Sequence, residues 1–170
     1  MNSAKNPKLL IVEDDAEQMD LLTAYALSEV EKLVVHENTT EQKKQALQSI
    51  DILRATNVQS LKKALSSKAN IFLAILDCNL PDAKGESAHD QLIKTNYRIT
   101  GQHKPIDLVI EYSPHTPITM ISSFNRFQSL LNQYYENKHD LSINFIRKND
   151  QSMIKRNIGH YLRQYLKEIS

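Results

Sequence analysis

Short apolar segments alternate along the chain with stretches whose apolar residues recur at helical spacing. Segments that are apolar at almost every position predict strands buried on both faces of a parallel sheet. Strands that alternate with helices predict an α/β fold, here a doubly wound parallel sheet of five strands. The predicted strands cover residues 8–12, 51–56, 71–76, 117–122 and 143–147.

The intervening stretches predict helices. Met19, Leu22, Ala26 and Val30 recur at helical spacing and predict a helix over 16–30. For 107–113 the apolar run is compatible with a strand or an extended loop. The other predicted helices begin at Asn38, which has the spacing of a capping box with Glu41, cover 58–67, 86–95 and 124–136, and run from Ile154 to the end.

Length and composition bound the class of protein. The chain has 170 residues, which favours one domain over 1–170, and its net charge of +1 gives no basic field for a nucleic acid or a membrane surface. The single cysteine, Cys78, excludes a disulfide framework, and the three glycines exclude Gly-rich phosphate loops. With no signal peptide and no long apolar run, a cytoplasmic location is expected.

The predicted strands end in residues that can carry chemistry. An acidic run, 13–15, follows the first strand, Asp77 follows the third, Ser122 ends the fourth and Lys148 follows the fifth. In open α/β sheets the functional crevice lies beyond the carboxyl ends of the strands, so these side chains are expected to meet there. Each one alone is more often a capping or solvated residue, but the whole set in this order is not expected by chance.

This set of side chains suits phosphoryl chemistry. Gathered carboxylates repel one another unless a cation shares the site, and Mg²⁺ prefers carboxylate oxygens with water and phosphate oxygens. A carboxylate beside the metal can attack phosphorus and form an acyl phosphate. A lysine and a hydroxyl can then hold the phosphoryl oxygens.

Four segments together resemble the signature segments of response-regulator receiver domains: "LLIVEDD", "AILDCNLPDAKG", "PITMISS" and "FIRK". The resemblance covers nearly the whole chain and implies the flavodoxin-like receiver fold. By position in these segments, Glu13 and Asp14 match the acidic pair, with Asp14 as the direct Mg²⁺ ligand. Asp77 matches the phosphoacceptor, and the backbone carbonyl of Asn79 matches a further metal ligand. Asp15, just after the pair, is expected at the N-terminus of a helix.

The resemblance also implies a switch. Ser122 matches the hydroxyl that follows the phosphoryl group, and Phe145 matches the aromatic residue that moves with it. Lys148 matches the lysine that pairs with the phosphoacceptor and then with the phosphate. The family usually has a proline after this lysine, in a cis bond, whereas this chain has Asn149, which puts the entry into the last helix in question.

The chain is longer than the resemblance requires. The surplus falls at about 31–50 and 96–113, both of which link a helix to the next strand, before the second and fourth strands. Such links lie at the end of the sheet opposite the crevice. They are either tolerated surface insertions, which cost little, or an added interaction surface. The chain ends one helix after Lys148, so no output domain is expected.

The resemblance implies a signalling domain that is not an enzyme in the usual sense. Its partners would be a histidine kinase or a histidine phosphotransfer protein, and then a downstream protein or a second copy of the chain. One alternative is a degenerate receiver that only binds partners, supported by the missing proline. Another is a phosphohydrolase of the haloacid dehalogenase type, which has an acidic residue two positions after its nucleophile. Asp77-Cys78-Asn79 lacks that residue, and the acidic pair comes first, so this alternative is disfavoured.

Overall fold

The computed structural model describes most of the chain, including every predicted strand. Its described residues are 6–36, 39–67, 70–77, 104–123, 132, 135–136 and 143–169. The helix predicted at 86–95, most of the helix predicted at 124–136, and Asn38 lie outside these residues.

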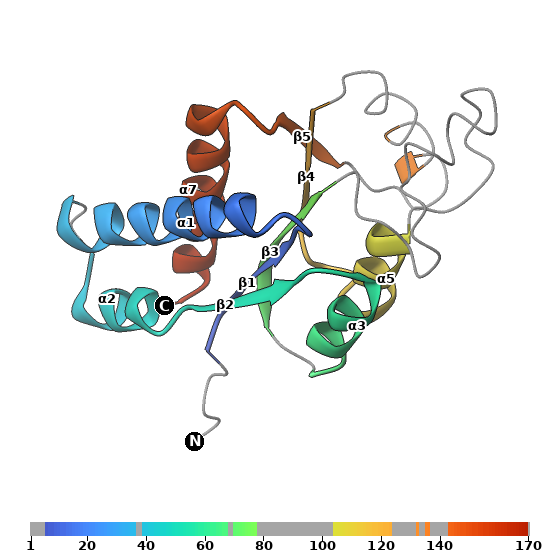
Figure 1. Cartoon of the computed structure of the whole chain (residues 1–170). Coiled ribbons are helices and arrows are strands. Elements are labelled where there is room, and N and C mark those ends of the chain that lie inside the picture. Colours follow the sequence, from blue (N-terminus) through green and yellow to red (C-terminus); the bar gives the residue numbers. More distant parts are fainter. Residues whose placement is uncertain are drawn as a thin grey trace, which may run out of the picture.

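Five parallel strands form a single sheet in the order β2-β1-β3-β4-β5 (Figure 1). Each predicted strand is confirmed to within one residue at either end. This strand order is that of flavodoxin-like folds, in which the order reverses between the first and third strands. The strands are β1 Lys8–Val12, β2 Asp51–Ala55, β3 Ile71–Asp77, β4 Ile118–Ser122 and β5 Asn144–Arg147.

The burial of each strand follows its place in the sheet. In β3, the central strand, all seven residues are buried, whereas β2 at one edge is mostly half-buried or exposed. A strand between two helical layers has apolar neighbours on both faces, which explains why IFLAILD carries no alternation of polar and apolar residues. The only charged residue of β3 is Asp77, at its carboxyl end.

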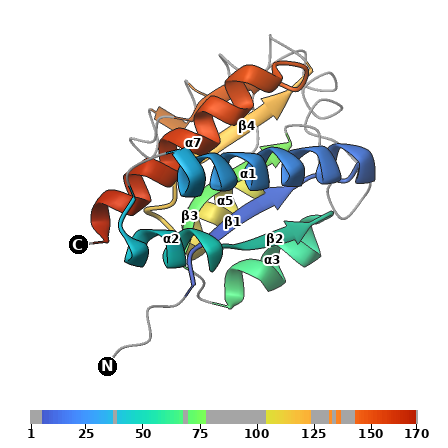
Figure 2. The same ribbon diagram turned by 90° about the vertical axis from the view of Figure 1, so that its left-hand side faces the viewer.

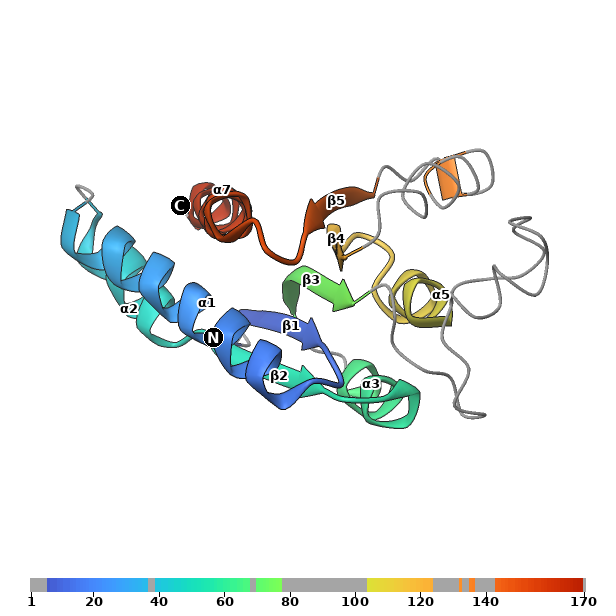
Figure 3. The same cartoon turned by 45° about the horizontal axis from the view of Figure 1, so that its top comes forward.

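Helices cover both faces of the sheet (Figure 3). On one face α1, α2 and α7 pack through a core that includes Leu22, Leu33 and Leu162. On the other face α3 and α5 pack through a second core that includes Leu61 and Ile106. The described helices are α1 Ala16–His36, α2 Glu41–Gln48, α3 Val58–Ser66, α5 Lys104–Tyr112 and α7 Gln151–Glu168.

The stretch at 31–50 is largely helical. The first helix does not end at residue 30 but continues to His36, because Leu33 extends its apolar stripe and is fully buried. A second helix, α2, follows and leads directly into β2, at the end of the sheet where the strands begin (Figure 2). The predicted capping box is wrong: the N-cap of α2 is Thr40, and its side chain makes no capping hydrogen bond.

The segment at 107–113 is a helix and not a strand or an extended loop. Helix α5 runs from Lys104 to Tyr112, so most of the described part of 96–113 forms this helix. Ile106 and Val109, three residues apart, are both fully buried, which is the spacing of one helical face. The apolar run was compatible with a strand or an extended loop, but packing against α3 and the sheet selects the helix.

Candidate functional site

The carboxyl ends of the strands bring the predicted residues to one edge of the sheet. Backbone hydrogen bonds continue past the strand ends: the Glu13 amide donates to the carbonyl of Ala55 at 3.0 Å, and the Lys148 amide donates to the carbonyl of Ser122 at 3.1 Å. Both residues are therefore held in line with the sheet although they lie just outside its strands. Asp77 is the last residue of β3, between them.

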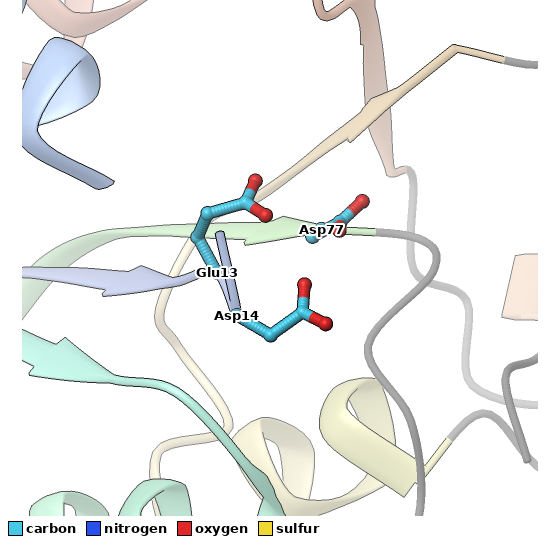
Figure 4. Close-up of side chains that lie close together, drawn as sticks. All are labelled: Glu13, Asp14 and Asp77. Atoms are coloured by element: carbon cyan, nitrogen blue, oxygen red, sulfur yellow. The ribbon is translucent and has the colours of Figure 1, made fainter. Parts of the chain in front are cut away.

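Three carboxylates gather at this edge, as the sequence predicts. In Figure 4 the side chains of Glu13 and Asp14 extend toward Asp77. One oxygen from each lies within 4.8 Å of the others. Glu13 and Asp77 are 0% and 2% exposed, whereas Asp14 is exposed to solvent. Two buried carboxylates this close together need cations to offset their charges.

Lys148 supplies one of those cations. Its Nζ lies 2.9 Å from Oδ2 of Asp77 and 2.9 Å from Oε2 of Glu13, and it donates a hydrogen bond to Oε1 of Glu13 at 3.2 Å. Burial alone would lower the pKa of Lys148. The hydrogen bonds and charges of Asp77 and Glu13 outweigh burial and raise that pKa above its ordinary value. Lys148 therefore carries its positive charge in the site at neutral pH.

One lysine leaves the cluster with an excess of negative charge. Burial, and next the charge of Asp77, raise the pKa of Glu13 to about 7, although Lys148 and the Asp15 amide act in the opposite direction. Oε2 of Glu13 accepts no hydrogen bond from the described residues, and only the nearby ammonium offsets its charge. A buried oxygen in this condition, beside two further carboxylates, fits a divalent cation with oxygen ligands, such as Mg²⁺.

The third acid of the run has a different task. Oδ1 of Asp15 accepts a hydrogen bond from the amide of Gln18 at 2.9 Å, so Asp15 caps the N-terminus of α1. The prediction for Asp15 is confirmed. Its own amide donates to Oε1 of Glu13 at 3.2 Å and helps to fix that carboxylate.

Comparisons with known proteins bear on the fold. No protein-family model matches the chain, and no curated protein matches it. Solved structures do match. The response regulator receiver protein from Sinorhizobium medicae WSM419 has a TM-score of 0.55 and 12% identity, over 95% of this chain and 98% of that chain. The CheY-like receiver domain protein from Methanospirillum hungatei JF-1 has a TM-score of 0.54 and 16% identity, with the same coverage of both chains.

A third solved structure, the response regulator receiver domain protein from Clostridium thermocellum, has a TM-score of 0.56 and 12% identity, over 96% of this chain and 99% of that chain. The chain has the receiver-domain fold. At these identities the similarity is one of fold, and it agrees with the strand order β2-β1-β3-β4-β5 of the described residues.

None of the helices in the described part of the chain is long and apolar enough to cross a membrane.

In this receiver fold the two predicted switch residues lie on adjacent strands. Ser122 of β4 is in register with Arg147, and Phe145 of β5 is in register with Met120. Because alternate residues of a strand share a face, Ser122 and Phe145 lie on the same face of the sheet. Both are half-buried, and Phe145 packs against the core on the α5 side. Asn79, the remaining predicted ligand, lies outside the described residues.

The entry into the last helix of the receiver fold needs no proline. Residues 147–150 form a turn in which the Asp150 amide donates to the carbonyl of Arg147 at 3.0 Å. Oδ1 of Asp150 then accepts a hydrogen bond from the amide of Met153 at 3.1 Å and caps α7. The sequence reasoning missed this cap, although an aspartate just before the apolar stripe that starts at Ile154 is a recognised N-cap signal.

Proposed function

We propose that the chain is a receiver that accepts a phosphoryl group on Asp77 from the phosphohistidine of a histidine kinase or a histidine phosphotransfer protein. The observation that carries the proposal is the arrangement around Asp77, a buried carboxylate within 2.9 Å of the Lys148 ammonium and beside Glu13 and Asp14. An isolated structural ion pair would not require the two further acids.

The proposed reaction transfers PO₃ between two side chains. An oxygen of the Asp77 carboxylate forms a bond to phosphorus as the phosphorus–nitrogen bond of the phosphohistidine breaks, and the imidazole leaves as the neutral base after taking up a proton. Mg²⁺, when bound, neutralises charge on the phosphoryl oxygens. Glu13, Asp14, Asp77 and the backbone carbonyl of Asn79 would hold it.

This chain's other residues act on charge and position. Lys148 holds one oxygen of Asp77 before transfer, and its ammonium can hold a phosphoryl oxygen afterwards. The burial of Glu13 and Asp77 limits the water that would otherwise screen these charges. The acyl phosphate is then lost by hydrolysis. The chain is therefore itself the phosphoryl acceptor and does not catalyse the conversion of a separate substrate. Phosphorylation would be read by a downstream protein or by self-association.

Two alternatives remain open to experiment. A degenerate receiver would bind partners without phosphorylation and would be expected to lack a residue of the phosphorylation site. In this chain the three acids and Lys148 are all in place. The phosphohydrolase alternative is disfavoured by the order of the acidic residues, and the strand order β2-β1-β3-β4-β5 is that of CheY-like proteins.

The deciding experiment is intact mass after incubation with acetyl phosphate and Mg²⁺. We expect a gain of about 80 Da, the mass of PO₃H, by the acyl-phosphate route. Asp77→Asn should abolish the gain. Asp150→Asn is the matched control, because asparagine caps a helix as well as aspartate does and Asp150 caps α7 without belonging to the carboxylate cluster. No gain in the folded wild type would favour the degenerate receiver.

A further inference from the structure

A second site-like feature lies at the opposite end of the sheet from Asp77. A pocket of ≈ 380 Å³ opens under the C-terminal part of α7, where β3 and β4 begin. Asn70 and Ile71, at the start of β3, line it, whereas Asp77 ends the same strand, so the two sites lie roughly 20 Å apart. Its volume falls in the range of pockets that bind small molecules. None of the residues proposed for phosphorylation lines it.

Aromatic rings form one wall of the pocket. Tyr161 and Tyr165 are four residues apart on α7 and share a face of that helix. The ring of Tyr165 packs on Phe72 with centroids 5.8 Å apart, and the ring of Tyr161 meets His160 edge to face at 5.1 Å. These contacts hold both tyrosine rings in place, and a fixed aromatic face attracts a cation.

The side chains that line the pocket give it a negative charge. Glu168 lines it and, in the described part of the chain, has no cationic partner. The pKa of Tyr165 is raised by burial and then by the charge of Glu168, so that charge acts inside the pocket. No described lysine or arginine lines it, and His115 is the one lining group that can become cationic.

Two helix C-termini add to this potential. Helix α7 ends at Glu168, and helix α5 ends at Tyr112, next to Ser113, which lines the pocket. The C-terminal end of a helix carries partial negative charge and favours cations. The last turn of α5 contains no basic residue, and the one in α7, Lys167, does not line the pocket.

We propose that this pocket binds a small organic cation, a primary ammonium or guanidinium group carried on an apolar body. Glu168 and the helix ends would hold the charge, and the tyrosine rings with Phe72 would cover the apolar part. A single carboxylate is too few for a hard metal ion, which takes several oxygen ligands. An anion would meet Glu168 and both helix ends with the wrong sign. The proposal does not depend on the phosphorylation of Asp77.

The test uses three probes that share a benzyl group and differ in charge. The full chain is titrated at about pH 8 with benzylamine, benzyl alcohol and phenylacetate, and binding is followed by amide chemical shifts around Tyr161 and Ser113. We expect benzylamine to bind most tightly and phenylacetate most weakly. Equal affinity for the amine and the alcohol would mean an apolar pocket without charge selectivity, and the tightest binding by phenylacetate would mean an anion site. Either result overturns the proposal.

A charge variant tests the role of Glu168. Glu168→Gln should weaken benzylamine binding by about threefold, the scale of one exposed ion pair, and leave benzyl alcohol binding unchanged. Glu111→Gln is the matched control, because Glu111 is exposed in the last turn of α5 but does not line the pocket. An equal loss in both variants would mean long-range charge and not a site. Phosphorylation by acetyl phosphate should be the same in Glu168→Gln as in wild type, so failure here and failure of the proposed receiver function are distinguishable.

Discussion

The Lys148 ammonium lies 2.9 Å from Oδ2 of Asp77, a residue 71 positions earlier in the chain. The same nitrogen lies 2.9 Å from Oε2 of Glu13. One cation therefore serves two buried carboxylates, one just after β1 and the other at the end of β3. Removal of Lys148 leaves both carboxylates without their counter-charge, whereas neutralising Glu13 reduces the negative excess. This asymmetry leads to the first two predictions.

Lys148→Met should destabilise the metal-free protein. Breaking a buried ion pair by removing one partner costs about 3–5 kcal/mol, and we expect roughly 2–3 kcal/mol here because Glu13 can take up a proton. Chemical denaturation in buffer with a chelator measures the loss. Lys8→Met is the control, because Lys8 pairs with Asp51 at 3.1 Å on the surface, where such a pair is worth less than about 1 kcal/mol. Equal losses would contradict the charge-balance argument.

Glu13→Gln should change how stability depends on pH. Burial, and next the charge of Asp77, raise the pKa of Glu13 from 4.5 to about 7 in the folded protein. The folded state therefore holds this proton more tightly than the unfolded state, and the associated stability is present below about pH 4.5 and is lost as the pH rises through about 7. Glutamine does not titrate, so the variant should gain stability relative to wild type between about pH 5 and pH 7.5 in metal-free buffer.

The measurement for Glu13→Gln is the unfolding free energy of both proteins across that range. Added Mg²⁺ should reduce the difference at the upper end, because the cation stabilises the ionised carboxylate. A difference that stays constant with pH would show that Glu13 does not titrate in this range.

Asp14 should contribute more to metal affinity than Glu13. We expect Asp14 to bind Mg²⁺ directly, whereas Glu13, already engaged by Lys148 and the Asp15 amide, more readily acts through water. Titration of Mg²⁺ into the Asp14→Ala and Glu13→Ala variants compares the two. Equal losses of affinity, or a greater loss in Glu13→Ala, would reverse this ranking.

Ser122→Ala should separate phosphorylation from its consequence. Asp77 should still be phosphorylated, but the hydroxyl would no longer move toward the phosphoryl oxygens and vacate space for Phe145. Amide shifts over 143–166 on addition of beryllofluoride, which stands in for the phosphoryl group, should therefore shrink. Those over the stretch at 31–50 should be small in both proteins.

Ser123→Ala, one residue further on and exposed, is the matched control for this experiment. It should leave the beryllofluoride shifts at their wild-type size. Undiminished shifts in Ser122→Ala would mean that the hydroxyl does not couple the phosphoryl group to this surface and that Phe145 is static core.

The meeting of the site residues was predictable from the sequence, because the carboxyl ends of parallel strands lie at the same edge of the sheet. That rule alone places Asp14, Asp77, Ser122 and Lys148 together, and the structure brings them to that edge. The approach of Lys148 to Glu13 was not predicted, because it depends on how the sheet twists and on how side chains pack. These are relations between distant segments that no local pattern records.

Two errors in the sequence analysis, at 107–113 and at the end of the first helix, have one cause. For 107–113, the apolar run suggested a strand or an extended loop, whereas the burial of Ile106 and Val109, three residues apart, is that of one face of a helix. For Leu33, the helical stripe continued beyond the point where polar residues became frequent. In both places tertiary packing decided the outcome, and intrinsic propensity was a weak guide.

The contact between Lys148 and Glu13 spans 135 positions of the chain, and this has a consequence for biosynthesis. While the chain is being made, the segments that carry Glu13, Asp14 and Asp77 leave the ribosome long before Lys148 does. A nascent chain that ends before β5 would have to bury two carboxylates without their lysine. We therefore expect the sheet to close around these acids near the end of synthesis, or earlier if a proton on Glu13 or a dissolved cation replaces the charge of the ammonium.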